Sequence, residues 1–201
     1  MGCIASVGYA RGSDKNAITL RLKESTTVPI EADSITPDNV IGRSQAEIET
    51  LPAFFGRRQV ELGDLFAVAG GDSANIVLEG DLSHVKRIGQ KMSRGRVTVH
   101  SDVGPHLGSE MSGGEIVVHG DVGAWAGAQM SAGRIWVHGD AGPMLGAAYA
   151  GEKLGMRGGV IIVDGDAGPR AAERMRRGLI VVQGGVGEFA GARMIAGSLF
   201  S

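Results

Sequence analysis

Residues 113–123 read Gly-Gly-Glu-Ile-Val-Val-His-Gly-Asp-Val-Gly. A short apolar strand, Glu115 to His119, is followed here by glycines, which is how a dinucleotide-binding turn begins. A dinucleotide site also needs an amphipathic helix directly after that turn. The sequence has another glycine and another apolar run there instead. The stretch therefore indicates a repeated strand and turn, and not a cofactor site.

The same pattern returns with a period of 19 residues. The unit Gly-x-x-Met-x-x-Gly-x-Ile-x-Val-x-Gly-Asp-x-Gly is kept over six copies, and the one step of 26 residues holds a seven-residue insertion within 147–155. With 34 glycines but 43% hydrophobic residues, the composition fits an ordered repeat better than a disordered chain. The repeated methionines are Met92, Met111, Met130, Met156, Met175 and Met194.

This unit predicts an all-β architecture. At about 3.3 Å per residue, one unit makes a loop of about 60 Å, which suits one coil of a parallel β-helix stacked about 4.8 Å from its neighbours. We therefore predict a single-stranded parallel β-helix with 19-residue coils over residues 60–201, ending inside a coil. Two columns are expected to line its interior: Val97, Ile116, Ile135, Ile161, Ile180 and Leu199, and then Val99, Val118, Val137, Val163 and Val182.

The residues before the coils differ in character. Residues 1–16 are expected to be a flexible start, and residues 17–59 a small α+β arm that caps the exposed strand edges of the first coil. Within the arm we expect a strand at 18–22 paired with 28–32, a helix starting at Thr36-Pro37, and a helix near 45–51 with a capping box of Ser44 and Glu47. Transitional coils are expected at 63–68 and 75–81.

Bulk properties exclude several classes of protein. The net charge of −2 argues against nucleic acid as a partner. The single cysteine excludes a disulfide framework and favours a reducing, cytoplasmic setting. No apolar run is long enough to span a bilayer, so we expect no membrane association.

One outward face of the coils becomes apolar toward the C-terminus. The outward column between the two interior columns changes from Thr98 to apolar residues, and its neighbour changes from Arg96, Glu115 and Arg134 to apolar residues. A stripe of this kind is rarely left in water, so we predict a subunit interface; cover by the chain's own arm or insertion is the alternative. The predicted interface residues are Val117, Trp136, Val160, Ile162, Leu179, Val181 and Phe200.

A column of histidines is the best candidate for chemistry. His100, His119 and His138 are one period apart and could hold a metal, but the column begins at Glu79 and continues as Asp164 and Gln183. We interpret it as a polar ladder at the strand ends. We likewise interpret the column of Asp81, Asp102, Asp121, Asp140 and Asp166 as a turn ladder, and Trp125 and Tyr149 as lone packing residues. We predict no catalytic, cofactor-binding or metal-binding residue in this chain.

Basic residues gather around the last methionines. Arg157 and Arg176 share one predicted column, and Arg174 and Arg193 share another. These side chains either extend into solvent and pair with nearby glutamates, or bind an anionic carrier or partner, for which guanidinium groups are well suited.

The arm and the coils together resemble a known family. Val-Pro-Ile-Glu-Ala-Asp-Ser-Ile-Thr-Pro-Asp at 28–38, Val-Glu-Leu-Gly-Asp-Leu-Phe at 60–66 and the methionine-glycine coils resemble the C subunits of formylmethanofuran dehydrogenase and of the bacterial formyltransferase/hydrolase complex. The coils alone are also similar to the C-terminal glycine-repeat domain of the glutamate synthase large chain. The resemblance covers about residues 17–200 and implies a right-handed β-helix. Members of that family usually run further, so we expect a shortened form.

The resemblance implies a non-catalytic scaffold subunit in one-carbon metabolism. Formyl transfer, hydrolysis to formate, and the interconversion of formyl carrier and CO2 would belong to other subunits, which would also hold any molybdenum or tungsten pterin. The resemblance further offers the acidic tail of a methanofuran-like carrier as a ligand for Arg157, Arg174, Arg176 and Arg193. Two alternatives remain open: a glutamate synthase-type spacer domain, and a stand-alone enzyme with a site on the flank of the coils.

Overall fold

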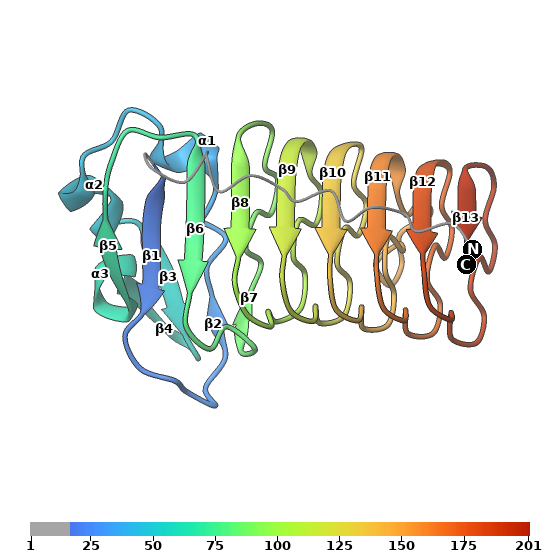
Figure 1. Ribbon diagram of the computed structural model, residues 1–201, viewed down its shortest axis with the longest axis horizontal. Coiled ribbons are helices and arrows are strands. Elements are labelled where there is room, and N and C mark those ends of the chain that lie inside the picture. The colour runs from blue at the N-terminus through green and yellow to red at the C-terminus, as the bar shows by residue number, and fades with distance from the viewer. Residues whose placement is uncertain (1–16) are drawn as a thin grey trace, which may run out of the picture.

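The computed structural model describes residues 17–201, so the expected flexible start at 1–16 lies outside the described residues. Figure 1 shows strands lying side by side along the length of the molecule, with the helices gathered at the end drawn in blue. The chain runs down the front as a strand, turns, and returns behind the strands before it forms the next one.

The strands form one large sheet and one small sheet. The large sheet has nine strands, and the small one has four. In order, the large sheet contains β13 (Ser198–Phe200), β12 (Arg177–Val182), β11 (Arg157–Val163), β10 (Ala132–Val137), β9 (Ser112–Val118), β8 (Arg96–Val99), β6 (Asn75–Glu79), β1 (Ile18–Leu22) and β5 (Phe66–Ala69). The small sheet contains β4 (Arg58–Glu61), β3 (Pro52–Phe55), β2 (Ile30–Glu31) and β7 (Val85–Lys86).

The predicted single-stranded parallel β-helix with a separate α+β capping arm is wrong as a description of this fold. The large sheet is open and mixed: β5 runs antiparallel to β1, and β1 pairs in parallel with β6, so the N-terminal segment supplies an inner strand of the sheet. The returning chain forms no named strand from β8 onward and carries only isolated bridges, such as Val103 with Val122. Its glycines and left-handed residues prevent continuous extended structure there.

The local predictions for the N-terminal segment meet mixed outcomes. Strand β1 lies where it was expected. Helix α1 (Pro37–Val40) has Thr36 as its N-cap, and α2 (Gln45–Glu49) has the Ser44–Glu47 capping box. The pairing of 28–32 with 18–22 is wrong, because β2 pairs with β3 and β7. The transitional coil expected at 63–68 is also wrong, since α3 (Leu62–Leu65) leads there into the reversed strand β5.

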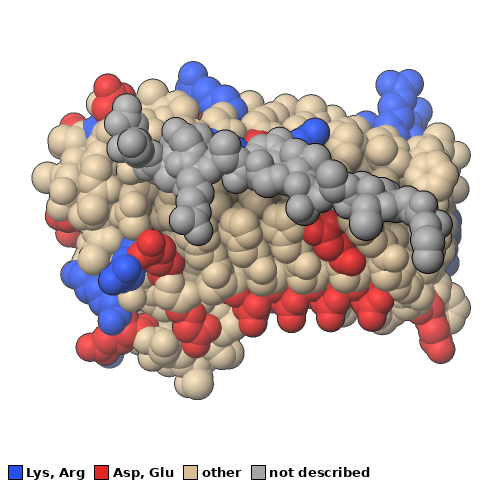
Figure 2. Space-filling view, viewed as in Figure 1, with Lys and Arg blue, Asp and Glu red and all other residues tan. Residues whose placement is uncertain are grey.

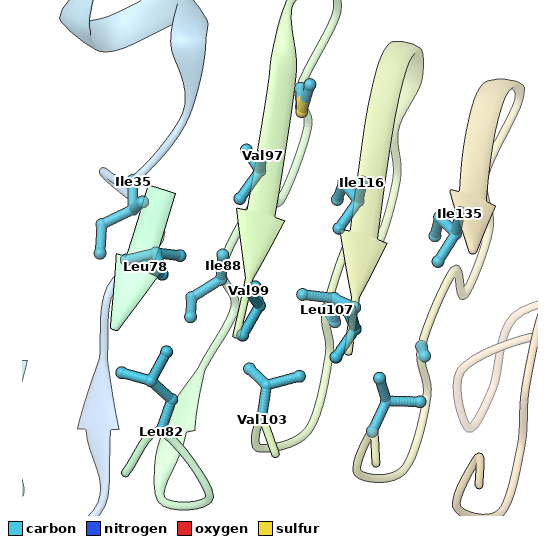
Figure 3. Close-up of a cluster of buried hydrophobic side chains, with 14 of the residues drawn as sticks. Ile35, Leu78, Leu82, Ile88, Val97, Val99, Val103, Leu107, Ile116 and Ile135 are labelled. Atoms are coloured by element: carbon cyan, nitrogen blue, oxygen red, sulfur yellow. The ribbon is translucent and has the colours of Figure 1, made fainter. Parts of the chain in front are cut away.

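The 19-residue register and the core it predicts are confirmed. Ile116 pairs with Val97 on one side and Ile135 on the other, and all three side chains are fully buried. In Figure 3, Ile88 and Leu107 of the returning chain lie beside Val97, Val99 and Ile116 of the strands. The core therefore lies between the sheet and the returning chain, and it continues through successive repeats.

The methionine and glycine of the repeat are explained by contact between neighbouring repeats. Met111 and Met130 are fully buried. A Cβ atom added to Gly133 would lie 2.7 Å from the Met111 methyl carbon, and one added to Gly159 would lie 2.6 Å from that of Met130. Both glycines also have a positive φ, 95° and 87°. Only glycine leaves room for the methionine of the preceding repeat, so the two residues recur together.

Candidate functional site

The predicted interface residues lie on one outward face of the large sheet. Pairing places Trp136 between Val117 and Ile162, and Val181 between Ile162 and Phe200. Val117 is buried, Trp136, Ile162 and Val181 are half-buried, and Phe200 is 60% exposed. In the adjacent outward column, Val160 and Leu179 are paired and half-buried. We name these seven residues the apolar strip.

The N-terminal border of the apolar strip is charged. Glu115 lies between two arginines of the neighbouring strands, with Oε2 at 3.7 Å from Arg96 Nε and Oε1 at 3.3 Å from Arg134 Nη1. Three neighbouring strands thus present an alternating row of charges beside the apolar residues. This row is polar and partly solvated, whereas the strip after it is apolar.

Trp136 has a polar attachment that the sequence did not suggest. Its indole Nε1 donates to both carboxylate oxygens of Asp164, at 3.1 Å each, and its ring lies 4.7 Å from that of His138. Asp164 follows Trp136 across the insertion, so spacing alone gave no sign of the contact. Trp136 is therefore fixed in orientation within the strip.

The histidine column is a stacked ladder, as predicted. The ring centroids of His100 and His119 are 5.0 Å apart, and those of His119 and His138 are 5.1 Å apart. Asp164 ends the stack: His138 Nδ1 lies 2.7 Å from its Oδ2, and Gln183 Nε2 donates to its Oδ1 at 2.7 Å. Within residues 17–201, no group of three or more histidine, cysteine, aspartate or glutamate side chains is arranged to hold a metal ion.

The aspartate ladder also forms. A turn ladder would use backbone donors of the same turn, but three of these carboxylates accept from the backbone of the next repeat. Asp102 Oδ1 accepts from the backbone N–H of Asp121 at 2.9 Å, Asp121 Oδ1 from that of Asp140 at 2.7 Å, and Asp140 Oδ1 from that of Asp166 at 2.8 Å. Each carboxylate thus joins its repeat to the next one. Figure 2 shows acidic groups in a row along this edge of the molecule.

The predicted basic residues do not form one cluster of free cations. Arg174 Nε lies 3.9 Å from Glu173, whose carboxylate also faces Arg170 Nε at 3.5 Å. Arg157 pairs with Arg177 rather than with Arg176, because the register shifts by one residue before Val160. Arg157, Arg176 and Arg193 are exposed. The predicted arginines therefore fall into two groups. The charge of Arg174 is partly neutralised by Glu173, whereas the other three side chains are open to solvent.

The returning chain carries an aromatic cluster that was missed. Trp125 and Tyr149 are not lone packing residues. His106 stacks on Trp125 at 5.4 Å between centroids, and its Nδ1 lies 2.9 Å from the Tyr149 hydroxyl. Tyr149 comes from the insertion and reaches back over two repeats. His106 and Trp125 are one period apart in the sequence, which could have indicated their stacking, but nothing indicated where Tyr149 would point.

Burial keeps this cluster neutral. It lowers the pKa of His106, and the nearby cations Arg87 and Lys86 lower it further. Burial raises the pKa of Tyr149, and the neighbouring Ser109 hydroxyl offsets part of that change. Ser109 Oγ has no hydrogen bond of good geometry, although the residue is fully buried. The contact between His106 and Tyr149 is therefore a neutral hydrogen bond at pH 7.

A cleft of about 450 Å³ lies between the N-terminal segment and the first repeats. It is lined by Glu31, Asp33, Thr36, Asp38, Asn39, Phe54, Arg87, Gln90 and Lys91. Most of its charges are paired: Glu31 with Arg87 at 3.2 Å, Asp38 with Arg94 at 3.1 Å, and Lys91 with Glu110 at 3.8 Å. Burial raises the pKa of Asp38, but hydrogen bonds from Ser93 and Arg94 outweigh it and lower the pKa overall. The first two pairs hold the segment against the repeats, and the third joins two neighbouring repeats.

Most polar side chains of these ladders and clusters contact one another. The ladder residues act as partners for one another, and the aromatic cluster ties the insertion to the returning chain. No helix among residues 17–201 has the length and apolar character needed to cross a membrane.

Comparisons with known proteins agree with the resemblance seen in the sequence. No family model matches the chain. The C subunit of the tungsten-containing formylmethanofuran dehydrogenase 2 of Methanothermobacter marburgensis is 40% identical over 95 residues, which are 45% of this chain and 35% of that protein. The C subunit of the formyltransferase/hydrolase complex Fhc of Methylorubrum extorquens is 38% identical over 89 residues, 44% of this chain and 34% of that protein.

A solved structure extends the match over most of the chain. One polypeptide in the crystal structure of the formyltransferase/hydrolase complex (FhcABCD) from Methylorubrum extorquens, in complex with methylofuran, superposes with a TM-score of 0.85 and 37% identity. The superposition covers 90% of this chain and 68% of that one. Against the curated relatives, the sequence match spans only about a third of their length.

Proposed function

Because this chain belongs to the family of C subunits of formylmethanofuran dehydrogenases and formyltransferase/hydrolase complexes, we propose that it is a non-catalytic subunit of such a complex. Its role is to hold other subunits in place while those subunits carry out the one-carbon chemistry. The apolar strip is the single observation that carries this proposal. A half-buried run of Trp136, Ile162 and Val181 beside an exposed Phe200 is typical of a surface that a protein partner covers.

The energetic argument rests on desolvation. Aliphatic and aromatic side chains on a flat sheet gain roughly 25 cal/mol for each Å² that a partner removes from water. The indole of Trp136 is already held by Asp164, so it loses little conformational freedom when a partner binds. A charge placed in the middle of the strip would have to be desolvated without a partner.

The test is recovery of other subunits from a co-expressed complex. Ile162→Lys with Val181→Lys should lower the affinity for the partner at least tenfold. The control is Phe189→Lys, because Phe189 is 69% exposed and lies on the returning chain outside the strip. Full recovery of partners by a well-folded double variant would contradict the proposal, as would equal loss in the control.

The non-catalytic part of the proposal has its own test. The isolated chain should neither transfer nor hydrolyse formyl groups. The assembled complex should keep its turnover when His100, an exposed member of the stacked ladder, is changed to glutamine. Formyl hydrolysis by the chain alone would contradict the proposal.

We also propose that any molybdenum or tungsten pterin is held by another subunit. Some relatives are named as tungsten-containing and others as molybdenum-containing enzymes. Metal analysis of the purified chain should therefore find neither element, and stoichiometric metal on the isolated chain would contradict this.

The arginines support a second, smaller proposal. Arg157 and Arg176 are exposed and have no ion-pair partner among residues 17–201. Together with Arg174 and Arg193 they could meet the acidic tail of a methanofuran-like carrier, or an acidic patch on a partner. Arg157→Glu with Arg176→Glu should weaken carrier binding or subunit retention, more at low salt than at high salt. If both are unchanged at low salt, these arginines are a solvated edge.

A further inference from the structure

The insertion at 147–155 is the one departure from the 19-residue period among the repeats that follow Met92. It leaves the sheet undisturbed, because β10 and β11 pair in register on either side of it. At its base, the N–H of Ala148 donates to the Glu173 carbonyl at 3.2 Å, and the N–H of Met156 donates to the Gly146 carbonyl at 2.8 Å. The extra residues therefore project outward from the returning chain, and Ala150 to Lys153 are all exposed.

Both ends of this exposed tip are tied down. On one side, Tyr149 lies against His106 and Trp125, with its hydroxyl 2.9 Å from His106 Nδ1. On the other side, the carbonyl of Leu154 accepts from Gln129 Nε2 at 3.3 Å. The tip is thus anchored at both ends, although it contributes nothing to the core. A loop with fixed ends loses less conformational freedom when it binds.

The tip carries two adjacent opposite charges with no local partner. Neither Glu152 nor Lys153 has an ion pair within residues 17–201, although cross-repeat pairs such as Lys91–Glu110 occur elsewhere in the molecule. The tip also lies across the core from the apolar strip, since the chain returns behind the strands (Figure 1). A partner seated on the strip would not reach it without wrapping around the repeats.

We propose that residues 150–153 form a recognition loop for a second protein subunit, whose surface presents a basic group to Glu152 and an acidic group to Lys153. The inference rests on the proposed function and adds a second contact to it. Insertions within repeat proteins commonly fall on a binding face, and complementary charges of this kind set orientation and partner choice. The loop and the strip thus hold different subunits on opposite sides of the repeats.

The experiment uses the chain co-expressed with the other subunits of its complex. Glu152→Lys with Lys153→Glu reverses the order of the charges without changing the net charge. It should lower the retention of one partner at least tenfold in low salt while leaving the melting temperature unchanged. The matched control is Lys23→Glu with Glu24→Lys, an exposed pair of adjacent opposite charges in the N-terminal segment.

Different outcomes separate the two proposals. If the unchanged chain recovers no other subunit, the proposed function fails. If the strip variant loses its partner but the reversed loop retains every subunit with unchanged affinity, the recognition loop is overturned and the scaffold role stands.

A second variant tests the role of Tyr149. Tyr149→Ala removes the ring and should both raise hydrogen exchange over 149–155 and weaken retention of the same partner. Tyr149→Phe keeps the ring contacts with Trp125 and loses only the hydroxyl, so it should lie between Tyr149→Ala and the unchanged chain. Unchanged exchange and unchanged retention in Tyr149→Ala would overturn the proposal.

Discussion

The two sides of each repeat follow different rules. On the sheet side, Val97, Ile116 and Ile135 occupy one buried column and are of one chemical kind. On the returning side, one column has a left-handed backbone in every repeat but five residue types at its six positions: Arg87, His106, Trp125, Met144, Arg170 and Phe189. Burial fixes the side chain on the sheet side. In that column only the backbone conformation repeats, so each side chain serves its own contacts. The next column of the returning chain faces the core and is apolar and buried, like the sheet side: Ile88, Leu107, Ala126, Leu145 and Ala171.

Two glycines with the same φ allow the cost of steric crowding to be measured apart from the cost of the backbone conformation. Gly159 and Gly151 both have φ of +87°, but a Cβ on Gly159 would lie 2.6 Å from the Met130 methyl carbon and 2.8 Å from the Gly133 carbonyl oxygen, whereas Gly151 has nothing within 4 Å. Gly159→Ala should therefore lower the free energy of unfolding by about 4 kcal/mol, the sum of overpacking and conformational cost. Gly151→Ala should cost only about 1 kcal/mol.

Urea unfolding of both variants measures this difference. Equal losses would mean that conformation alone requires the repeated glycines, and the contact with methionine would then not explain the Met-x-x-Gly spacing.

Two methionines test the comparison with one residue type. Met130 is fully buried in the core, whereas Met144 is a half-buried member of the returning column. Met130→Ala should cost about 3 kcal/mol, because it opens a cavity that its neighbours cannot fill. Met144→Ala should cost less than about 1 kcal/mol, as is usual near the surface. Thermal and urea unfolding measure both losses of stability. A larger loss for Met144 would mean that burial does not decide which methionine the fold depends on.

The same division explains what the sequence predicted. The inward columns, the register, Thr36 as a cap and the Ser44–Glu47 capping box follow from local chemistry or from a repeated pattern, and they were predicted correctly. The antiparallel strand β5 beside β1 was not, because that pairing joins segments whose short apolar runs carry no signal for direction. A parallel β-helix was inferred from the period, which specifies spacing but not whether the returning chain forms strands.

The candidate sites show the same limit. The alignment of Trp136 with Ile162 and Val181 follows from the period and was predicted correctly. The bond from Trp136 to Asp164 and the contact between Tyr149 and His106 each depend on one side chain reaching a neighbour across the insertion. A repeat pattern indicates only the residues that recur from one repeat to the next. A contact that occurs once leaves no signal in a single sequence.

The aspartate ladder lies at the boundary between the two sides and should have a moderate effect. Asp121→Ala removes the acceptor for the Asp140 N–H, and it should cost about 1 kcal/mol because the site is exposed and water can replace the carboxylate. Asp121→Asn keeps an oxygen in place and should cost less. Urea unfolding distinguishes the two variants. An asparagine variant as unstable as the alanine variant would mean that the charge, and not the hydrogen bond, joins the repeats.

The smallest expected effect comes from His106 on the returning side. Burial lowers its pKa below the ordinary value of 6.5, as do Arg87 and Lys86, while Glu31 opposes them. As the pH falls below about 6.5, the unfolded chain takes up a proton that the folded chain does not yet bind, so stability declines until the lowered pKa is passed and is then constant.

Between pH 7.5 and pH 5, His106→Gln should therefore lose less stability than the unchanged chain. The difference between the two should be smaller than the stability that Asp121→Ala loses. Tyr149→Phe should keep most of the wild-type pH dependence, because burial is the largest cause of the shift. Urea midpoints at the two pH values provide the measurement, and identical pH dependence in His106→Gln and the unchanged chain would show that the cluster is open to water and that Tyr149 does not shield it.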